Sequence, residues 1–299
     1  MDLSVIIVNY KSYACLQNCI ASLALALVQI DAEIIVVDND SEALNLLPLQ
    51  QQFPLVKWLV NTKNEGFSRA NNQALSQANG DYILFLNPDT VVSLGIFETL
   101  IQYFGQHKMV GAVGVQMENK EGKFLAESKR SFPTSKSAFF KMCGLAKLFP
   151  RSAYFNAYAL GHLAKDKIHI VDVLAGAFMM VPKAVLTQIG GFDNRFFMYA
   201  EDIDFCYRIQ ELGYEIHYIG TQKITHLKGG STNKHTETYR KYFYGSMELF
   251  VKKYSRTKYS LTEKWILIIG IRLARYLAAV RSFLVRFFYG EDIFFLELL

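Results

Sequence analysis

Short apolar runs alternate with amphipathic stretches along the first 90 residues of the chain. Four of these runs are rich in β-branched and aromatic side chains and predict buried strands, at residues 4–9, 33–37, 56–60 and 82–86. Between them, apolar residues recur with helical spacing at about residues 14–27 and 67–78. Strands that alternate with helices in this way predict an α/β fold with a mainly parallel central sheet and flanking helices.

The pattern is less regular after residue 100. Residues 111–115 continue the sheet, residues 119–122 predict a hairpin turn, and residues 171–181 form a long apolar run around Gly176. Residues 131–167 are mixed and aromatic, and we interpret them as a variable loop and helix region over a functional site. Helical spacing returns at residues 202–212. No repeat or linker divides this stretch, so we treat the chain up to residue 235 as one domain.

The last 64 residues have a different pattern, typical of amphipathic helices. An aromatic and basic helix is predicted at residues 239–254 and a long apolar helix at residues 262–289. The longest uncharged run of the second helix, residues 265–271, is far short of the roughly 20 residues that cross a bilayer. On a helical wheel Arg281 lies opposite a quadrant that holds four other cations: Lys264, Arg272, Arg275 and Arg286. This is the pattern of an interfacial helix, and a helix packed on the domain or on a partner chain is the alternative.

Charge adds to this picture once it is located along the chain. The 299 residues are 51% hydrophobic, enough for a full core, and carry a formal net charge of +5. Residues 228–299 hold 13 Lys and Arg against 6 Asp and Glu, whereas residues 1–227 hold 19 against 21. A basic tail on a nearly neutral body indicates an anionic partner, and the interfacial pattern favours phospholipid over nucleic acid.

The N-terminus and the cysteines indicate the compartment. The first four residues contain no Lys or Arg before the apolar run begins, which is unlike a signal peptide and predicts residence in the cytosol. The four cysteines have no paired CxxC spacing, and we expect them to be reduced: Cys15, Cys19, Cys143 and Cys206.

Polar side chains follow the predicted strands where they end. Asn9, Asp38 and Asp89 fall at carboxyl ends, the edge where parallel sheets bind their ligands. The first strand is followed by Tyr10 and not by GxGxxG, which argues against a dinucleotide site. Asp38 can accept a hydrogen bond from a base or ribose and Tyr10 can stack on that base. The alternative for a strand-end Asp is a turn or helix cap.

Two further segments carry acids or a histidine in places suited to metal binding. Asn87-Pro88-Asp89 closes a very apolar strand, and a carboxylate there can meet Mg²⁺ or Mn²⁺ together with diphosphate oxygens. A type I turn with Pro88 at its second position explains the same residues. His226 follows another predicted strand, and a lone His is most often structural.

Three carboxylates crowd into four residues at the start of a predicted helix: Glu201, Asp202 and Asp204. Acids at a helix N-terminus are favoured electrostatically, which is the ordinary explanation. Clusters of this kind next to aromatic residues are also where a general base is found. The spacing lets Asp202 face a cleft while Glu201 and Asp204 cap or brace the helix.

In this order, six segments resemble the family 2 glycosyltransferases of the GT-A fold, and most closely their rhamnosyltransferase-like bacterial branch. The segments are SVIIVNYKS, IIVVDND, NEGFSRANNQAL, YILFLNPDT, LAGAFMMVPKAVLTQIGGFDNRFFMYAEDIDFCYR and ITHLKGGST. They extend from residue 3 to about residue 232. Six motifs in one order are far more specific than any one of them.

The resemblance implies a role for each matching residue. Tyr10 and Asp38 match positions that hold the nucleotide base, and the rest of the donor-binding set is Asn9, Asn64, Gly66, Asn72 and Asn87. Asp89 matches the metal ligand of a DxD-like motif, and His226 a position that often completes the metal site. Glu201 and Asp202 match an ED pair with Asp202 as the base. Two departures are Asp40, where relatives often have Ser, and the single acid of the DxD-like motif.

The resemblance also implies a reaction. We expect inverting transfer of a sugar, with dTDP-rhamnose as a candidate donor, to a glycan or lipid-linked acceptor in cell-surface polysaccharide synthesis such as that of O-antigen. Residues 1–115 would form the nucleotide-sugar half, residues 116–235 the acceptor half, and residues 236–299 a tail at the inner face of the cytoplasmic membrane. The alternatives are a non-catalytic nucleotide-sugar-binding membrane-associated protein and a nucleotidyltransferase, which normally needs a glycine-rich and basic phosphate loop.

Overall fold

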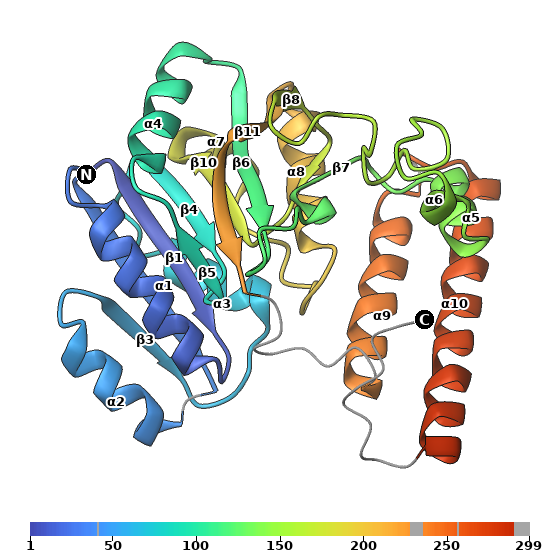
Figure 1. The fold of residues 1–299 in the computed structure, drawn as a ribbon, viewed down its shortest axis with the longest axis horizontal. Coiled ribbons are helices and arrows are strands. Elements are labelled where there is room, and N and C mark those ends of the chain that lie inside the picture. The colour runs from blue at the N-terminus through green and yellow to red at the C-terminus, as the bar shows by residue number, and fades with distance from the viewer. Residues whose placement is uncertain (41, 228–235, 256, 290–299) are drawn as a thin grey trace. The chain divides into compact units, whose positions relative to one another are not determined.

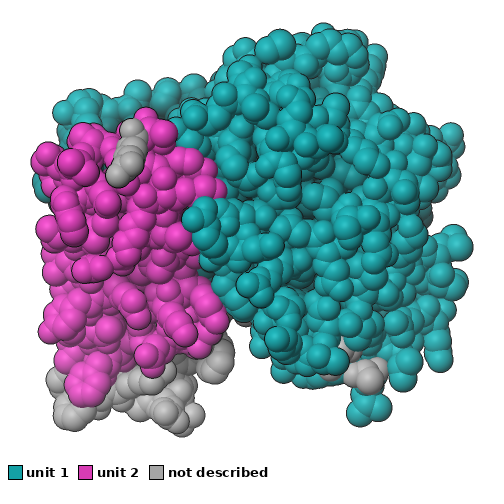
Figure 2. All heavy atoms as spheres, turned by 180° about the vertical axis from the view of Figure 1, so that it is seen from behind, with its two compact units in different colours: residues 1–231 teal, residues 232–299 magenta. Residues whose placement is uncertain are grey.

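The computed structural model describes residues 1–40, 42–227, 236–255 and 257–289. It divides into two compact units, Met1–Ser231 and Thr232–Leu299 (Figure 2). The expected domain boundary at residue 235 lies outside the described residues, as does the Gly229-Gly230-Ser231 segment of the last motif. Each unit is considered by itself below.

Four parallel strands form one half of the central sheet of the first unit (Figure 1). Their order is β3-β2-β1-β4, with bounds Lys57–Asn61 for β3, Ala32–Asn39 for β2, Leu3–Asn9 for β1 and Tyr82–Leu86 for β4. Every residue of β1 is buried, because strands flank it on both sides and helices cover the sheet. The register pairs Asn9 with Asp38, so the carboxyl ends of β1 and β2 lie at the same edge as predicted.

The other half of the sheet is mixed. β10 (Phe178–Pro182) runs antiparallel between β4 and β6 (Val110–Glu118), and β11 (Glu215–His226) is parallel to β6. β5 (Thr90–Val92) and β8 (Ile168–Ile170) pair antiparallel with β11. The described sheet therefore has nine strands, most of them parallel, which confirms the predicted fold class.

The apolar run at residues 171–181 forms two strands, one on each side of Gly176. β9 (Val173–Leu174) pairs with β7 (Lys129–Arg130) in a separate small sheet, and β10 begins after Gly176. The chain therefore leaves one sheet and enters another at this break. The pairing with β9 also brings β7, at the start of the segment at residues 131–167, next to residues 173 and 174.

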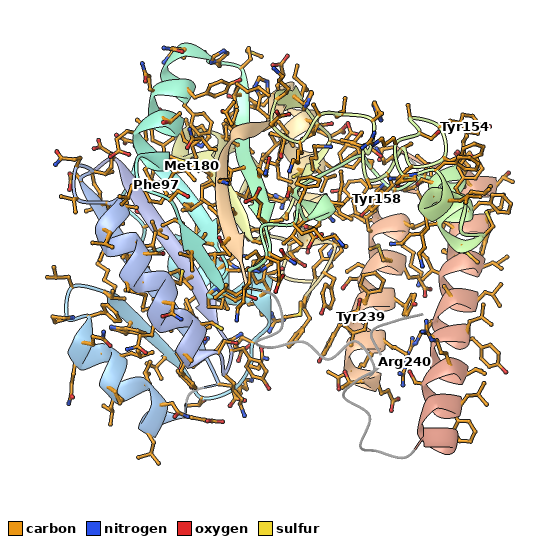
Figure 3. All side chains as sticks on the ribbon, viewed as in Figure 1. Phe97, Tyr154, Tyr158, Met180, Tyr239 and Arg240 are labelled. Carbon is orange, nitrogen blue, oxygen red and sulfur yellow. The ribbon has the colours of Figure 1, made fainter. Side chains whose placement is uncertain are left out.

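Helices cover the sheet and connect its strands (Figure 1). Those of the first half are α1 (Tyr13–Ala26), α2 (Ala43–Gln52), α3 (Phe67–Leu75) and α4 (Ile96–Gln106). Those of the second half are α5 (Ser135–Met142), α6 (Leu145–Leu148), α7 (Lys183–Ile189) and α8 (Glu201–Glu211), with a short 3₁₀ turn at Ala126–Ser128. The sequence pattern did not predict α2, because Pro48 lies inside it. Phe97 of α4 and Met180 of β10 are fully buried core residues (Figure 3).

The second unit consists of α9 (Glu237–Lys253) and α10 (Leu261–Tyr289), close to the predicted bounds. Leu267 and Ile268 of α10 are buried, and Arg272 pairs with Glu248 of α9 at 2.7 Å. Other apolar side chains of α10 are about half exposed or more: Trp265, Ile266, Ile269, Leu273, Tyr276 and Leu277. None of the described helices has the length and apolarity to span a bilayer.

Candidate functional site

The ends of β1 and β2 are joined by a small buried hydrogen-bond network. The Asn9 amide donates to Asp38 Oδ1 at 2.7 Å, and the Tyr13 hydroxyl donates to Asp38 Oδ2 at 3.2 Å. Asn9 Oδ1 accepts from the Ser12 backbone at 3.2 Å. Asp38 is fully buried and is therefore fixed in direction, while its oxygens retain lone pairs for a further donor. Tyr13 was not among the predicted site residues, since its hydroxyl reaches Asp38 only through the turn of α1.

Tyr10 follows directly after Asn9, the last residue of β1. It is half-buried, and Lys11 Nζ is 5.7 Å from the centroid of its ring. Lys11 also pairs with Glu42 at 3.2 Å. The ring belongs to the residue after Asn9, which pairs with Asp38 in the sheet register, and its stacking on a base stays a prediction.

Asn39, the last residue of β2, holds the loop before α3. Its amide donates to Asn64 Oδ1 at 2.9 Å and to the Gly66 carbonyl at 3.3 Å. Its own Oδ1 accepts from the Glu65 backbone at 3.0 Å. Asn39 was overlooked as a site residue because a strand-end Asn has many ordinary roles. It shapes the loop that carries the predicted donor residues Asn64 and Gly66.

Gly66 contacts the loop that leads to the acidic cluster. Its φ is +86°, and a Cβ at this position would lie 2.6 Å from the Phe197 carbonyl oxygen. The next residue, Phe67, donates its backbone N–H to that same oxygen at 2.7 Å. Only glycine fits here, and the result is a fixed distance between the donor-side loop and the segment before Glu201.

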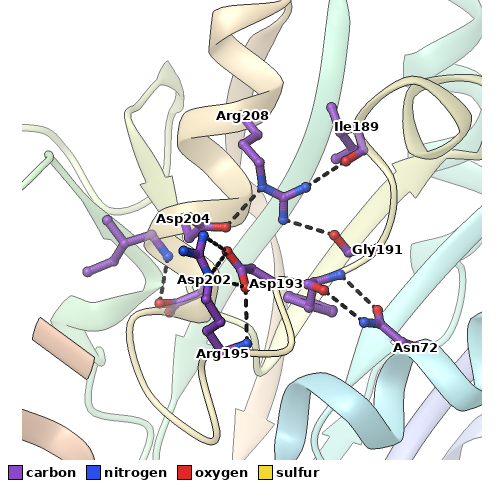
Figure 4. Close-up of polar contacts among 10 residues, drawn as sticks. Asn72, Ile189, Gly191, Asp193, Arg195, Asp202, Asp204 and Arg208 are labelled. Atoms are coloured by element: carbon purple, nitrogen blue, oxygen red, sulfur yellow. Dashed lines mark hydrogen bonds and ion pairs between the residues drawn. The ribbon is translucent and has the colours of Figure 1, made fainter. Parts of the chain in front are cut away.

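Asn72 makes a second connection to that segment (Figure 4). Its amide donates to the Phe192 carbonyl and to Asn194 Oδ1, both at 2.8 Å, and its Oδ1 accepts from the Phe192 backbone at 2.8 Å. A Cβ on Gly191 would lie 2.1 Å from Asn72 Oδ1, so this close approach also requires glycine. The structure gives Asn72 a positioning role, and direct contact with a donor stays a prediction.

The Asn87–Asp89 turn meets the end of β11. The Asn87 carbonyl accepts from the Thr90 hydroxyl at 2.8 Å, which closes the turn that Pro88 favours. Antiparallel pairing places His226 opposite Thr90, and His226 Nε2 lies 3.0 Å from Asp89 Oδ1. The two predicted metal ligands, 137 residues apart in the chain, are therefore in direct contact.

This pair has some of the features of a metal site. Both side chains are largely buried, at 15% exposure for Asp89 and 10% for His226. His226 Nδ1 is buried and has no hydrogen-bond partner in the described part of the chain. Among the described residues no cluster of three or more His, Cys, Asp or Glu side chains forms. One carboxylate and one imidazole can hold a divalent cation only if phosphate oxygens and water supply the remaining ligands.

The acidic cluster begins α8 after a strained turn. Tyr199 and Ala200 both have positive φ, at +70° and +60°, which is rare for residues with a Cβ. Asp204 is fully buried and pairs with Arg208 Nε at 2.9 Å. Arg208 also donates to the carbonyls of Ile189 and Gly191 at 2.8 and 2.9 Å (Figure 4). Asp204 and Arg208 thus brace α8 against the loop that Asn72 also holds.

Asp202 is paired with Arg130, a residue that the sequence did not single out. Arg130 Nη2 donates to Asp202 Oδ2 at 2.5 Å and to the Leu174 carbonyl at 2.9 Å. Asp202 Oδ1 accepts from the Ile203 backbone at 2.8 Å. The pair is largely buried, at 13% and 14% exposure. Asp202 therefore keeps a small exposed surface and a fixed direction.

Glu201 has a different environment. Glu201 is 8% exposed, and its Oε2 has no hydrogen-bond partner among the described residues. Burial, and secondarily the charge of Asp202, raises the pKa of Glu201 to about 8. Glu201 therefore holds its proton at neutral pH, while Arg130 stabilises negative charge on its neighbour.

One short stretch of backbone connects the two halves of the site. The Ala177 carbonyl accepts from the Asn87 backbone at 3.0 Å. A Cβ on the adjacent Gly176 would lie 3.8 Å from that of Asp202 and 3.6 Å from the Phe67 ring. The Asn87–Asp89 turn, α3 and Asp202 thus converge on residues 176 and 177. The arrangement offers polar strand ends, a carboxylate–imidazole pair and a fixed carboxylate at one edge of the sheet.

Comparison with known proteins places this geometry in context. A family model described as glycosyltransferase like family 2 matches residues 2–243. The N-acetylglucosaminyl-diphospho-decaprenol L-rhamnosyltransferase of Mycobacterium tuberculosis is 25% identical over 243 residues, 78% of each chain. Rhamnosyltransferase WbbL of Escherichia coli K12 is 29% identical over 195 residues, 62% of this chain and 69% of that one.

A solved structure shares the fold. The crystal structure of S. aureus TarS 1-349 in complex with UDP-GlcNAc superposes with a TM-score of 0.59 at 18% identity. The match covers 97% of this chain and 76% of that one. At this identity the likeness bears on the fold alone.

Proposed function

The chain belongs to glycosyltransferase family 2 and is a rhamnosyltransferase-like glycosyltransferase of GT-A fold. We propose that it transfers a sugar, with inversion, from a nucleoside-diphosphate donor to a lipid-linked acceptor. The observation that carries the proposal is the convergence on residues 176 and 177. The Asn87–Asp89 turn bonds to Ala177, and Asp202 packs beside Gly176. A donor at the strand ends and an acceptor near Asp202 would therefore meet at this point.

The donor nucleotide is proposed to bind at the ends of β1 and β2. Asn9 and Tyr13 hold the Asp38 carboxylate in one orientation. Its remaining lone pairs would accept a hydrogen bond from the base or the ribose of the nucleotide. Tyr10 would stack on the base, and the loop with Asn64 and Gly66 would line the pocket. Because Asn39 fixes that loop through three hydrogen bonds, little ordering is needed when the donor binds.

Asp89 and His226 would hold Mg²⁺ or Mn²⁺, with Asn87 beside the diphosphate. The cation would neutralise negative charge on the departing nucleoside diphosphate. The donor set favours Mn²⁺, because an imidazole nitrogen is a poor ligand for Mg²⁺, which prefers oxygen. The contact between Asp89 Oδ1 and His226 Nε2 supports the pairing of these two side chains at one ion.

Asp202 is the proposed general base. Its carboxylate takes the proton of an acceptor hydroxyl as that oxygen forms a bond to the anomeric carbon. The bond from that carbon to the diphosphate oxygen breaks on the opposite face, and its electron pair leaves with the nucleoside diphosphate. One such displacement inverts the configuration. Glu201, protonated at neutral pH, adds no second negative charge beside the base.

The names of the relatives and the exposed apolar residues of the tail support a proposal for the acceptor and the location. The Mycobacterium relative is named for a sugar carried on diphospho-decaprenol, and both reported relatives are named as rhamnosyltransferases. We therefore propose dTDP-rhamnose as donor, a diphosphate-linked lipid sugar as acceptor and a role in cell-surface polysaccharide synthesis. The exposed apolar side chains of α10 support peripheral attachment at the inner face of the cytoplasmic membrane.

The experiment that tests the reaction is a panel of nucleotide sugars assayed for nucleoside-diphosphate release, with Mg²⁺, Mn²⁺ or EDTA and with membrane extract as acceptor source. We expect one donor to be used and the anomeric configuration of the product, read by NMR, to be inverted. Asp202→Asn should lower kcat about 10²–10⁴-fold with donor affinity kept. Donor binding without turnover on any acceptor would instead favour a non-catalytic nucleotide-sugar-binding protein.

A further inference from the structure

The segment that begins at β7 is basic throughout. Residues 128–165 contain seven Lys and Arg and no Asp or Glu, whereas the rest of residues 1–227 carries 12 against 21. The seven cations are Lys129, Arg130, Lys136, Lys141, Lys147, Arg151 and Lys165. Residues 128–165 therefore have a net charge of +7, whereas the rest of residues 1–227 has a net charge of −9. Arg130 of this basic segment pairs with Asp202.

This segment encloses most of a hollow of about 380 Å³. Arg130, Lys141 and Lys147 line it, together with Tyr158 and Phe155. Glu127 is the one carboxylate among the lining residues that the structure describes. The volume lies within the range of small-molecule sites. Three cations against one acid make the hollow suited to an anion.

The hollow is adjacent to the proposed base through Arg130. That side chain lines the hollow, donates to Asp202 at 2.5 Å, and lies 3.4 Å from the Tyr158 hydroxyl. Lys141 Nζ is 5.9 Å from the centroid of the Tyr158 ring, so these two lining residues of the hollow are neighbours. Aromatic faces pack against sugar rings, and lysines bind phosphate as point charges.

Exposed apolar side chains lie close to the same lysines in the sequence. Phe139 and Met142 of α5 are 61% and 51% exposed, and Leu148 of α6 is 69% exposed. Lys141 precedes Met142, and Lys147 precedes Leu148. Helices that alternate exposed apolar and basic side chains suit a ligand with a charged group next to a hydrocarbon chain.

We propose that this hollow is the acceptor subsite, in which Lys141 and Lys147 bind the diphosphate of an amphiphilic acceptor and Tyr158 contacts its sugar. The inference rests on the proposed function and adds the diphosphate group as the feature recognised. The sugar hydroxyl would then be directed toward Asp202, and the hydrocarbon chain would leave past Phe139, Met142 and Leu148.

Binding of farnesyl diphosphate to the full-length chain tests the site without requiring turnover. Calorimetry is carried out in EDTA, which removes the divalent cation that the diphosphate of the sugar donor would need at Asp89. Binding of farnesyl diphosphate at the donor site is then suppressed. The K141A/K147A variant should bind at least about tenfold more weakly, which corresponds to about 1.4 kcal/mol. K141R/K147R should stay within about threefold of the wild type. The matched control K120A/K123A removes two exposed lysines from the 119–123 turn and should bind like the wild type.

The outcomes separate this inference from the proposed reaction. Asp89→Ala should leave farnesyl diphosphate binding unchanged, so a chain with no transferase activity can still support the subsite. No binding by the wild type, equal losses in K141A/K147A and K120A/K123A, or a K141A/K147A value within twofold of the wild type would overturn it. Equal loss of binding to phosphatidylglycerol vesicles would also overturn it, because the lysines would then recognise anionic lipid in general. Farnesol, which lacks the diphosphate, should bind wild type and variant alike.

Discussion

Arg130 Nη2 donates to Asp202 Oδ2 at 2.5 Å, and the same guanidinium binds the Leu174 carbonyl. The contact joins β7 to the first turn of α8 across 72 residues of sequence. It fixes the direction of the carboxylate that we propose as the general base. Arg130 acts on the reaction through Asp202 and is therefore a positioning residue.

Replacing Arg130 should lower turnover much more than donor binding. We expect Arg130→Ala to reduce kcat about 100-fold, because the carboxylate loses its fixed direction, while the donor KM stays within about twofold. Arg130→Lys should recover part of the loss, since a lysine keeps the charge but not the planar fork. Steady-state kinetics with each substrate varied give the two constants. An equal change in kcat and in donor KM would contradict a positioning role.

How much of this site the sequence could predict depends on the kind of contact. Asn9, Asp38 and Asp89 were placed correctly because each ends an apolar strand, and parallel strands share one carboxyl edge. The contact of Asp89 with His226 was expected only from the resemblance, since it needs β11 to return beside β5.

Arg130 had no readable signal before the structure. It lies in an irregular segment, and only the small β7–β9 sheet brings it to α8. Asn39 and Tyr13 were missed for a related reason, because each acts by bracing another residue and not by contacting a ligand. The sequence shows that residues 128–165 contain no Asp or Glu, but only the structure shows that several of the basic residues there line one hollow.

The buried Glu201 should make stability depend on pH. Its pKa is raised by burial to about 8 from an ordinary value near 4.5, so the folded chain binds a proton that the unfolded chain releases between these values. This contribution is complete below about pH 4.5 and is lost as the pH rises to about 8, at about 1 kcal/mol per pH unit. Glu201→Gln should remove this dependence. Urea denaturation at pH 5, 6, 7 and 8 would show it as a stability difference that grows in favour of the variant.

A control separates this effect from other titrations. Glu211, at the exposed end of α8, offers the matched change Glu211→Gln, whose pH profile should follow the wild type. Parallel profiles for Glu201→Gln and the wild type would mean that Glu201 is ionised in the folded chain at neutral pH.

Replacing His226 should change the Mn²⁺ concentration needed for activity more than the turnover rate at saturating Mn²⁺. If it holds the cation with Asp89, His226→Ala should raise the Mn²⁺ concentration for half-maximal activity at least about tenfold, with smaller change at saturating Mn²⁺. Titration of Mn²⁺ into EDTA-treated protein measures this. His169, whose ring nitrogen binds the Ala164 carbonyl, provides a control substitution away from Asp89. An unchanged Mn²⁺ requirement in His226→Ala would show that His226 does not bind the cation, and of the two proposed metal ligands Asp89 alone would remain.

Gly66 should be intolerant of even one added carbon. A Cβ there would lie 2.6 Å from the Phe197 carbonyl oxygen, at a φ of +86°. Gly95 has a similar φ of +74° but nothing within 4 Å of the same position. We expect Gly95→Ala to cost about 1 kcal/mol from backbone strain and Gly66→Ala about 2–4 kcal/mol from strain and overlap. Urea denaturation of both variants tests the difference. Equal costs would mean that the Phe197 loop moves aside freely.

The apolar face of α10 should determine attachment to membranes. Trp265 and Ile269 are 57% and 63% exposed, one helical turn apart, and Arg272 is paired with Glu248. Because Arg272 is already paired with Glu248, we expect insertion of the apolar face into the membrane to contribute to binding in addition to the basic residues of α10. Replacing both Trp265 and Ile269 with Ser should weaken binding to phosphatidylglycerol vesicles at least about tenfold in sedimentation assays, because two large side chains no longer leave water.

The matched control replaces exposed apolar residues of the first unit. Leu44 and Leu55 are 89% and 95% exposed, more than either α10 residue, and the Leu44→Ser and Leu55→Ser double variant loses similar apolar surface. Its vesicle binding should equal that of the wild type, because α2, which carries Leu44, has no basic side chain to hold it at an anionic surface. Equal weakening in both double variants would show general hydrophobic adsorption. Unchanged binding in the α10 variant would mean that this apolar face does not enter the membrane, and attachment would then depend on the basic side chains of residues 236–299.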